Sequence, residues 1–160
     1  MNNLESIFEE LGFDRREVRQ PQAAVVYAIA RTYNLVMRHL EGVYQRFGLS
    51  APSFNLLLLL QRGRDPESLT QRVLAERLVI SPSNLTGLVD RLERKGLVRR
   101  IPGSDRRTNH LQITPKGSQL LEKIWPHHAE AMERLSAGLQ NDERDVLGRA
   151  LSCLRHALTT

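Results

Sequence analysis

Residues 70–96 read TQRVLAERLVISPSNLTGLVDRLERKG, and this stretch decides the fold. Thr70 and Ser81 are residues of the kind that cap helix N-termini, and apolar residues at helical spacing follow each of them. Gly96 can end the second helix, because glycine readily adopts the left-handed conformation found at helix ends. The link between the two helices, residues 79–80, is short. Such helices must cross at a large angle, which predicts a helix-turn-helix.

The second helix of this pair has two chemically distinct faces. Its apolar stripe consists of Leu85, Leu88, Val89 and Leu92. Small polar, acidic and basic residues lie outside the stripe, at Ser83, Asn84, Thr86, Gly87, Asp90, Arg91 and Arg94. This pattern predicts a helix that packs on a core through one face and presents the other to solvent or to a ligand.

After the second helix, the spacing of apolar residues changes from that of a helix to that of a strand. Residues 97–101 and 108–113 alternate in character, and turn-forming residues lie between them at 102–105. The pattern predicts a β-hairpin whose tip carries Arg106 and Arg107. A helix-turn-helix followed by a hairpin is a winged helix.

Helices are predicted on both sides of this segment. The first runs over residues 21–47, with apolar positions Val26, Ile29, Ala30, Tyr33, Met37, Leu40, Tyr44 and Phe47. Ser50 can cap the next, and its five consecutive leucines, residues 56–60, predict that it is largely buried.

Two further helices are predicted after the hairpin. The longer one starts at Thr114-Pro115 and repeats apolar residues at Leu120, Ile124, Ala131 and Leu135. The last begins at Asn141 or Asp142 and carries a leucine seam, Leu147, Leu151, Leu154 and Leu158. A seam of this spacing usually packs on another helix.

Composition limits the class of protein. The chain has 160 residues, of which 41% are hydrophobic, and its longest apolar run, residues 23–30, is far below the roughly 18 residues of a membrane span. Neither disorder nor a membrane span is therefore expected. The N-terminus lacks the basic and apolar regions of a signal peptide and there is a single cysteine, so we expect a cytoplasmic protein.

The positive charge lies in the middle of the chain. Residues 62–117 carry twelve Lys or Arg and six Asp or Glu, whereas the other 104 residues carry eleven and twelve. Alone, a charge run of this kind is also compatible with a solvated face. Its position on a predicted helix-turn-helix and hairpin instead indicates a polyanionic partner.

Duplex DNA fits these elements, because its major groove, about 12 Å wide, accepts one α-helix. Residues near the N-terminus of that helix contact base edges; here they are Ser81, Ser83, Asn84, Thr86 and Gly87. Asn84 can bond adenine through two hydrogen bonds, whereas Ser81 is a weaker candidate because its oxygen is expected to cap the helix. Arg91 and Arg94 are placed to contact phosphate or a more distant guanine. The alternative is that Ser and Asn here act only as caps.

The hairpin tip suggests a second contact. Arg106 and Arg107 cannot reach a core from a turn, and a narrow minor groove attracts arginine through its enhanced negative potential. Asp105 can orient Arg107 through a charge-assisted hydrogen bond, although it is also an ordinary turn residue.

Four motifs together resemble the MarR family of bacterial transcription regulators. They are AERL at 75–78, SPSNLTGLVDRLERKGLV at 81–98, DRR at 105–107 and LQITPKG at 111–117. The similarity is close over the helix-turn-helix and wing and extends, in the order and length of the helices, over residues 21–158.

This resemblance implies a triangular homodimer in which the first and last helices interlock. It implies one recognition helix per half-site, a wing that places Arg107 in the minor groove, and repression of a nearby operon. Such repression is often relieved by a small phenolic or other aromatic anion, or by cysteine oxidation.

The implied division of the chain has three parts. Residues 1–20 are an N-terminal extension with a short helix, 21–48 and 115–160 form a helical dimerisation region, and 49–114 form the DNA-binding domain. The predicted fold is mainly α with a small β-hairpin wing, a winged helix-turn-helix domain between long N- and C-terminal dimerisation helices.

The chain departs from the family in two ways. Its N-terminal extension is longer than the core family needs, and the reactive cysteine near the first helix of peroxide-sensing members has no counterpart. Cys153 lies beside Leu151 and Leu154, where a small buried residue is expected rather than a redox switch.

Effector, metal and enzyme sites give weaker signals. The resemblance places an effector where the first long helix meets the winged domain, and Tyr33, Met37 and Trp125 are candidates that could equally be core residues. His127 is expected to be a core or interface histidine rather than a ligand, and no metal or cofactor is predicted.

No motif of a known enzyme class occurs in the sequence. The competing hypothesis is an architectural or adaptor DNA-binding protein without an effector. A bare winged helix needs only about half this length, so the long flanking helices favour a regulator.

Overall fold

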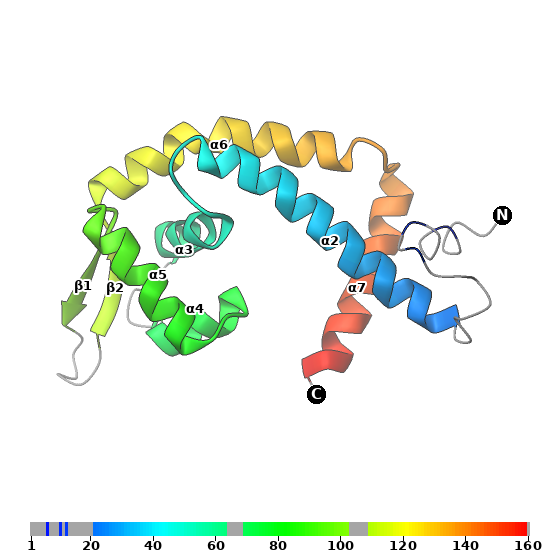
Figure 1. Cartoon of the computed structure of the whole chain (residues 1–160), viewed down its shortest axis with the longest axis horizontal. Helices are drawn as coiled ribbons and strands as arrows, with labels where there is room; N and C mark the ends of the chain where they lie inside the picture. The colour runs from blue at the N-terminus through cyan, green and yellow to red at the C-terminus, as the bar shows by residue number, and fades with distance from the viewer. Residues whose placement is uncertain are drawn as a thin grey trace.

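The computed structural model describes residues 21–63, 69–102 and 109–159, together with Ser6, Glu10 and Gly12. The chain is mainly helical, with one hairpin (Figure 1). In order, the elements are α2 (Pro21–Gln45), α3 (Ala51–Arg62), α4 (Gln71–Leu78), α5 (Pro82–Arg94), β1 (Val98–Pro102), β2 (Asn109–Ile113), α6 (Pro115–Ser136) and α7 (Asn141–Thr159). The predicted fold class is therefore confirmed. Most of the N-terminal extension, with its predicted short helix, lies outside the described residues.

Side-chain caps start four of these helices. Ser50, Thr70, Ser81 and Thr114 each accept a hydrogen bond from the backbone N–H three residues further on, over 3.1–3.4 Å. Such caps satisfy donors that have no partner within the helix. The predicted helix starts at these four positions are confirmed.

The turn between α4 and α5 contains an unusual residue. Val79 has a φ of 53°, in the left-handed region, and its N–H donates to carbonyls at the end of α4. A β-branched residue rarely adopts this conformation, and the side chain is 89% exposed. Val79 thus turns the chain sharply enough for α5 to cross α4 after a three-residue link.

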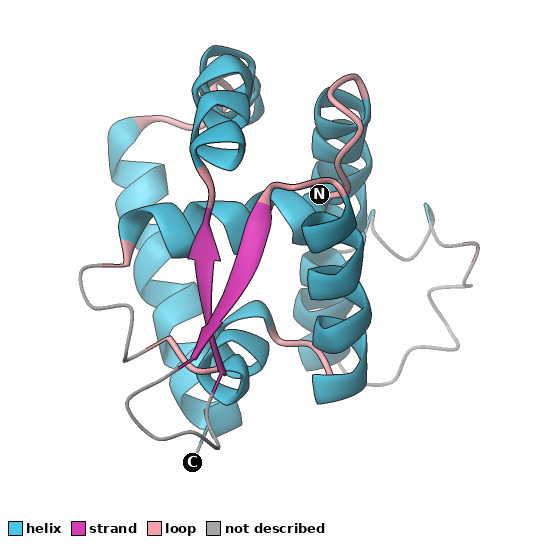
Figure 2. Cartoon of the chain, turned by 90° about the vertical axis from the view of Figure 1, so that its left-hand side faces the viewer, coloured by secondary structure: helices cyan, strands magenta, loops and turns pink. Residues whose placement is uncertain are grey.

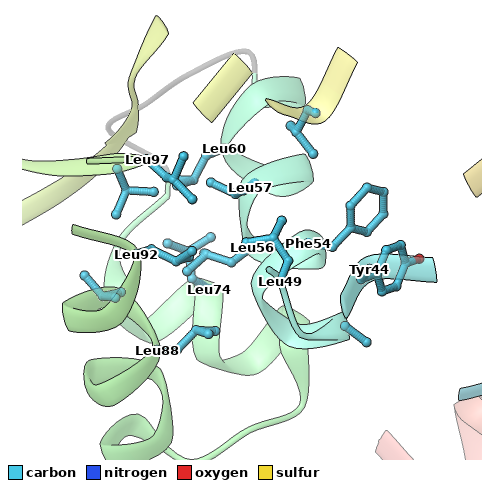
Figure 3. Packing of buried hydrophobic residues seen from close by; sticks show 14 of the residues in the cluster. Tyr44, Leu49, Phe54, Leu56, Leu57, Leu60, Leu74, Leu88, Leu92 and Leu97 are labelled. Atoms are coloured by element: carbon cyan, nitrogen blue, oxygen red, sulfur yellow. The ribbon is translucent and has the colours of Figure 1, made fainter. Parts of the chain in front are cut away.

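The core of the winged domain lies between α3 and the helix-turn-helix. Leu56, Leu57 and Leu60 of α3 belong to one buried cluster with Leu88 and Leu92 of α5, and Figure 3 shows Leu56 facing Leu92. All four predicted stripe residues of α5 are buried, and Leu74 of α4 completes the contact. Burial of this helix pair fixes which face of α5 is left to solvent.

The hairpin packs directly against the start of α6. Its strands are antiparallel and pair from Val98 with Ile113 to Pro102 with Asn109; Figure 2 shows them side by side. A Cβ on Gly117 would lie 2.3 Å from the carbonyl oxygen of Leu97, so only glycine fits where α6 passes the base of the hairpin. The wing is thereby attached to the long helix.

The two ends of the chain form a helical frame beside the winged domain. α6 runs across the top of the molecule in Figure 1, α2 packs along it, and α7 descends from its far end. Leu40 and Tyr44 of α2 are buried, but the predicted positions Val26 and Tyr33 are 63% and 61% exposed. Only the C-terminal half of the predicted α2 stripe therefore contributes to the core of this chain.

α7 has no buried residue. Its leucine seam remains uncovered within one chain, since Leu147 is 45% and Leu158 is 85% exposed. The prediction that Cys153 is buried is therefore wrong for the single chain: the thiol is exposed, because α7 packs on too little of the same chain.

On α6 the predicted stripe is confirmed at Ile124 and Ala131, which are buried, while Leu120 is half-buried against the core. Leu135, the last predicted position, is exposed, and Leu121 is buried in addition. His127 is exposed in the single chain, so the core alternative predicted for it is wrong, whereas its placement at an interface stays a prediction. His128 is the residue that faces α2 and α3.

Candidate nucleic-acid interface

The solvent face of α5 carries the predicted base-contacting residues. The exposed ones are Ser81, Ser83, Asn84, Thr86, Arg91 and Arg94, while Gly87 is half-buried. α5 contacts β1, and the hairpin extends away from α6 beside it (Figure 1). The helix and the wing are thus presented together at one end of the molecule.

Several polar groups on this face already have partners. Ser81 caps α5 as predicted, the Ser81 and Ser83 hydroxyls lie 3.0 Å apart, and the Thr86 hydroxyl donates to the carbonyl oxygen of Pro82 over 3.0 Å. Among the described residues, no hydrogen bond involves the side-chain amide of Asn84. Asn84 is therefore the residue at this end of α5 whose donor and acceptor are both available to a base.

Gly87 leaves an open position in the middle of the exposed face. An added Cβ would meet only Nη1 of Arg91, at 3.7 Å, which is an ordinary contact. Packing within the chain does not require glycine there. Absence of a side chain instead allows the backbone of α5 to approach a neighbouring surface closely.

Arg100 connects α5 to the wing, a role that was not predicted from the sequence. Its guanidinium donates to Oδ1 of Asp90 over 2.5 Å and also to Oε2 of Glu93, and its backbone N–H donates to Oε1 of Glu93 over 3.2 Å. The hydrogen bond to Asp90 is the largest cause that raises the pKa of Arg100. One of the basic residues counted toward the charged segment therefore neutralises acids of α5 rather than facing outward.

The wing is stiffened at its stem. Nε of Arg99 donates to Oε1 of Gln112 across the two strands, over 2.8 Å. The predicted tip residues Asp105, Arg106 and Arg107 lie outside the described residues. Their positions in the chain put them between the paired ends of β1 and β2.

The three effector candidates do not converge on one site. Tyr33 lies on the exposed half of α2, and Met37 is partly buried against the core. Trp125 is 41% exposed and lines a cavity of about 310 Å³ with residues of α3 and α6; neither Tyr33 nor Met37 lines it.

An aromatic cluster behind this cavity joins α2, α3 and α6. Tyr44 stacks on Phe54 with ring centroids 4.3 Å apart, as Figure 3 shows, and its hydroxyl lies 2.9 Å from Nδ1 of His128. The ring centroids of Trp125 and His128 lie 5.3 Å apart, and Cζ of Arg62 lies over the Trp125 ring, 4.8 Å from its centroid. This cluster was not predicted from the sequence, because its residues come from three helices that are separate in the chain.

Two titrating groups in the cluster have shifted pKa values. Burial, with a smaller effect of Glu41, raises the pKa of Tyr44 to about 12. Burial, with a smaller effect of Arg62, lowers the pKa of His128. At neutral pH both groups are therefore uncharged, and the tautomer of His128 sets which of the two donates in their hydrogen bond.

The described part of the chain contains neither a grouped set of metal ligands nor a membrane-spanning helix. There, no three His, Cys, Asp or Glu side chains are grouped to hold a metal ion. No described helix combines the length and apolar character needed to cross a bilayer.

Comparison with known proteins identifies the same segment. A match to the MarR family spans residues 47–108. The chain is 35% identical over 139 residues to the uncharacterized HTH-type transcriptional regulator YkoM of Bacillus subtilis, covering 86% of this chain and 87% of YkoM. It is 30% identical over 135 residues to the HTH-type transcriptional repressor YetL of the same species, covering 84% and 78%.

A solved structure shows a similar arrangement of elements. Sco3205, a MarR family transcriptional regulator from Streptomyces coelicolor in complex with DNA, is 27% identical, with a TM-score of 0.77. The similarity covers 85% of this chain and 86% of Sco3205. All three similar proteins are transcriptional regulators by name.

Proposed function

Because this chain belongs to the MarR family of winged helix-turn-helix transcriptional regulators, we propose that it represses transcription by binding a pseudo-palindromic operator as a homodimer. The observation that carries this proposal is the exposed polar face of α5 beside the wing. Each copy would insert one α5 into the major groove, with recognition helices about 34 Å apart, one turn of DNA.

In this proposal, the residues of α5 have different roles. Asn84 reads a base, Ser83 and Thr86 contact bases or phosphates, and Gly87 lets the backbone approach the groove. Arg91 and Arg94 contact phosphate from the later turns of the helix. At the wing tip, Arg107 enters the minor groove, held by Asp105, and Arg106 adds a second charge.

The uncovered helices support the homodimer. Val26 and Tyr33 on α2 and the leucines of α7 are apolar side chains that one chain leaves in water. Most of the stability of a helix in a protein comes from the packing of its apolar face, and α7 has no buried residue in one chain, so a further surface is needed to cover it. We therefore assign 21–48 and 115–160 to dimerisation and 49–114 to DNA binding.

Regulation by a small aromatic anion belongs to the same proposal. The cavity beside Trp125 gives such an effector a place where the helical frame meets the winged domain. Its binding would change how the two α5 helices are spaced and thereby weaken operator binding.

A footprint of the purified protein on the DNA upstream of its own reading frame tests the proposal. We expect one discrete protected site with two half-sites about one helical turn apart. Even coverage of the fragment would instead show an architectural DNA-binding protein. No protection of the DNA at low salt would contradict both the repressor and the architectural protein.

A further inference from the structure

The elbow between α4 and α5 carries an apolar hollow on the surface of the winged domain. Ala75 of α4, Val79 and Ile80 of the link, and Pro82 of α5 give the hollow its apolar walls. No described residue of any other element lines it. The hollow is therefore formed by the helix-turn-helix alone, and it opens to solvent beside the first turn of α5.

Val79 is the residue of this elbow that folding explains least. It has a φ of 53°, and its side chain is 89% exposed. Its N–H donates to the carbonyl oxygen of Glu76, and the N–H of Ile80 donates to that of Ala75, both over 3.1 Å. These hydrogen bonds hold the left-handed conformation at the end of α4, a position that glycine usually takes.

A valine at this position costs stability and gains no packing from the described chain. Its branched Cβ is strained at positive φ, whereas glycine adopts this conformation freely. The exposed isopropyl group also leaves apolar surface in water. Because the turn itself needs only the backbone, the side chain of Val79 is available for a contact outside the chain.

We propose that Val79 is a specificity-determining residue that recognises thymine, by packing its isopropyl group against the C5-methyl group of that base in the major groove. The proposal rests on the DNA-binding function proposed above and adds a base contact outside α5. Thymine is the base that presents an apolar group in this groove, so an apolar side chain distinguishes it from the other three bases.

The position of Val79 in the chain supports this contact. Val79 precedes Ser81, the cap of α5, by two residues, and two residues span at most about 7 Å. Neighbouring bases of one DNA strand are about 3.4 Å apart along the helix axis. When the first turn of α5 lies in the groove, Val79 is therefore within about two base pairs of that turn. We expect the thymine to flank the base that Asn84 reads.

Stiffness and charge favour the same partner. A β-branched side chain has few rotamers, so Val79 presents its methyl groups in a fixed direction and loses little entropy on contact. Glu76, which also lines the hollow, is paired with Arg72 over 3.0 Å, and this pairing compensates a charge that would repel DNA. A thymine methyl group placed between Val79 and Pro82 would remove apolar surface of both molecules from water.

Deoxyuridine tests the contact, because its base differs from thymine only in lacking the C5-methyl group. We would take the operator duplex defined by the footprint, replace each thymine in turn at the same position of both half-sites, and measure affinity by fluorescence anisotropy. One buried methyl-sized group corresponds to about a fourfold change in affinity, so we expect one position to lose about fifteenfold over two half-sites. Thymines outside the half-sites should tolerate the replacement.

Variants of Val79 separate the side chain from the turn. Val79→Gly relieves the left-handed strain and should raise the urea midpoint of unfolding, and Val79→Asn carries a polar side chain that tolerates this conformation. Both variants should bind the thymine and deoxyuridine operators equally. Val79→Ile, which keeps a branched apolar group, should retain the discrimination of the wild type.

The coupling between protein variant and base decides the assignment. Each effect of deoxyuridine is compared in the wild type and in Val79→Gly, so effects on DNA shape or on overall affinity cancel. No sensitive thymine in the wild type, or the same sensitivity in Val79→Gly, would overturn the contact and leave the repressor intact. Absence of any discrete operator would overturn the repressor and, with it, the contact.

Discussion

At the scale of single residues, Gly87 is a position where the stability of the fold and the binding of DNA are expected to favour different side chains. Alanine exceeds glycine in helix propensity by about 0.8–1.0 kcal/mol, and the added Cβ meets only an ordinary contact in this chain. We therefore expect Gly87→Ala to raise the free energy of unfolding, measured by urea denaturation. If α5 lies against a groove, the same methyl group should weaken operator binding by about 1 kcal/mol or more, the scale of a mismatched base pair.

Gly42 provides the matched control for this substitution. It lies within α2, away from α5, and an added Cβ has no atom of the described residues within 4 Å. Gly42→Ala should give a similar gain in stability with unchanged operator affinity. Unchanged affinity in Gly87→Ala would show that the backbone at Gly87 does not approach DNA.

His128 makes a second residue-scale prediction, which concerns pH. Burial lowers the pKa of His128 in the folded chain, so below its unfolded value of about 6.5 the unfolded chain binds more protons. The stabilising contribution is therefore present above pH 6.5 and is lost as pH falls through the lowered folded pKa. We expect His128→Gln, which keeps both a donor and an acceptor for Tyr44, to flatten this part of the stability curve.

The comparison needs a histidine that is not packed in the cluster. His39 is exposed, so His39→Gln should retain the wild-type loss of stability between pH 7 and 5. Urea denaturation between pH 7 and 5 gives the free energy of unfolding of the wild type, His128→Gln and His39→Gln as a function of pH. A wild-type slope in His128→Gln would remove His128 as the source of the acid sensitivity.

At the scale of elements, the Arg100 cluster determines how the wing stands beside the recognition helix. Replacing Arg100 by Gln removes the link from β1 to Asp90 and Glu93 and leaves two uncompensated carboxylates on the DNA-facing helix. Both acids are partly exposed, so we expect a loss of only about 1 kcal/mol in stability. Operator affinity should fall further, because the carboxylates repel phosphate and the wing is no longer fixed.

A second substitution distinguishes the two effects on DNA. Arg100→Gln combined with Asp90→Asn removes one of the repelling charges without restoring the link. Recovery of most of the affinity in anisotropy titrations would assign the loss to charge, and no recovery would assign it to the position of the wing. Wild-type affinity in Arg100→Gln itself would contradict both roles.

Sequence reasoning predicted local features better than contacts between elements. The caps at Thr70, Ser81 and Thr114 depend on residues three apart, so their chemistry is visible in the sequence. Arg100 was not predicted to bind Asp90, because this contact exists only after β1 has folded back along α5.

Periodicity did not determine every contact of the other helices. On α6 the predicted positions Ile124 and Ala131 are buried, but His128 rather than His127 packs against α2 and α3. Cys153 was expected to be buried because the leucine seam of α7 requires a partner, and one chain does not contain that partner. Periodicity shows which face of a helix is apolar but not which surface covers it.

At the scale of the whole molecule, α7 and the first half of α2 are the parts that a second copy would have to cover. Leu154→Glu places a charge in the exposed leucine seam, whereas Ser152→Glu adds the same charge on the opposite side of α7. If the seam forms the dimer interface, Leu154→Glu should lower the sedimenting mass toward that of one chain, 18.3 kDa, at micromolar concentration. Ser152→Glu should keep twice that mass.

Thermal unfolding and operator binding test the same interface independently. A protein that is folded mainly as a dimer has an unfolding midpoint that rises with protein concentration, because association binds only the native state. We expect this dependence in the wild type and in Ser152→Glu and its loss in Leu154→Glu. Because one monomer contacts only one half-site, Leu154→Glu should also bind the full operator no more tightly than an isolated half-site. Retained dimer mass in Leu154→Glu, together with tight operator binding, would place the dimer interface elsewhere on the molecule.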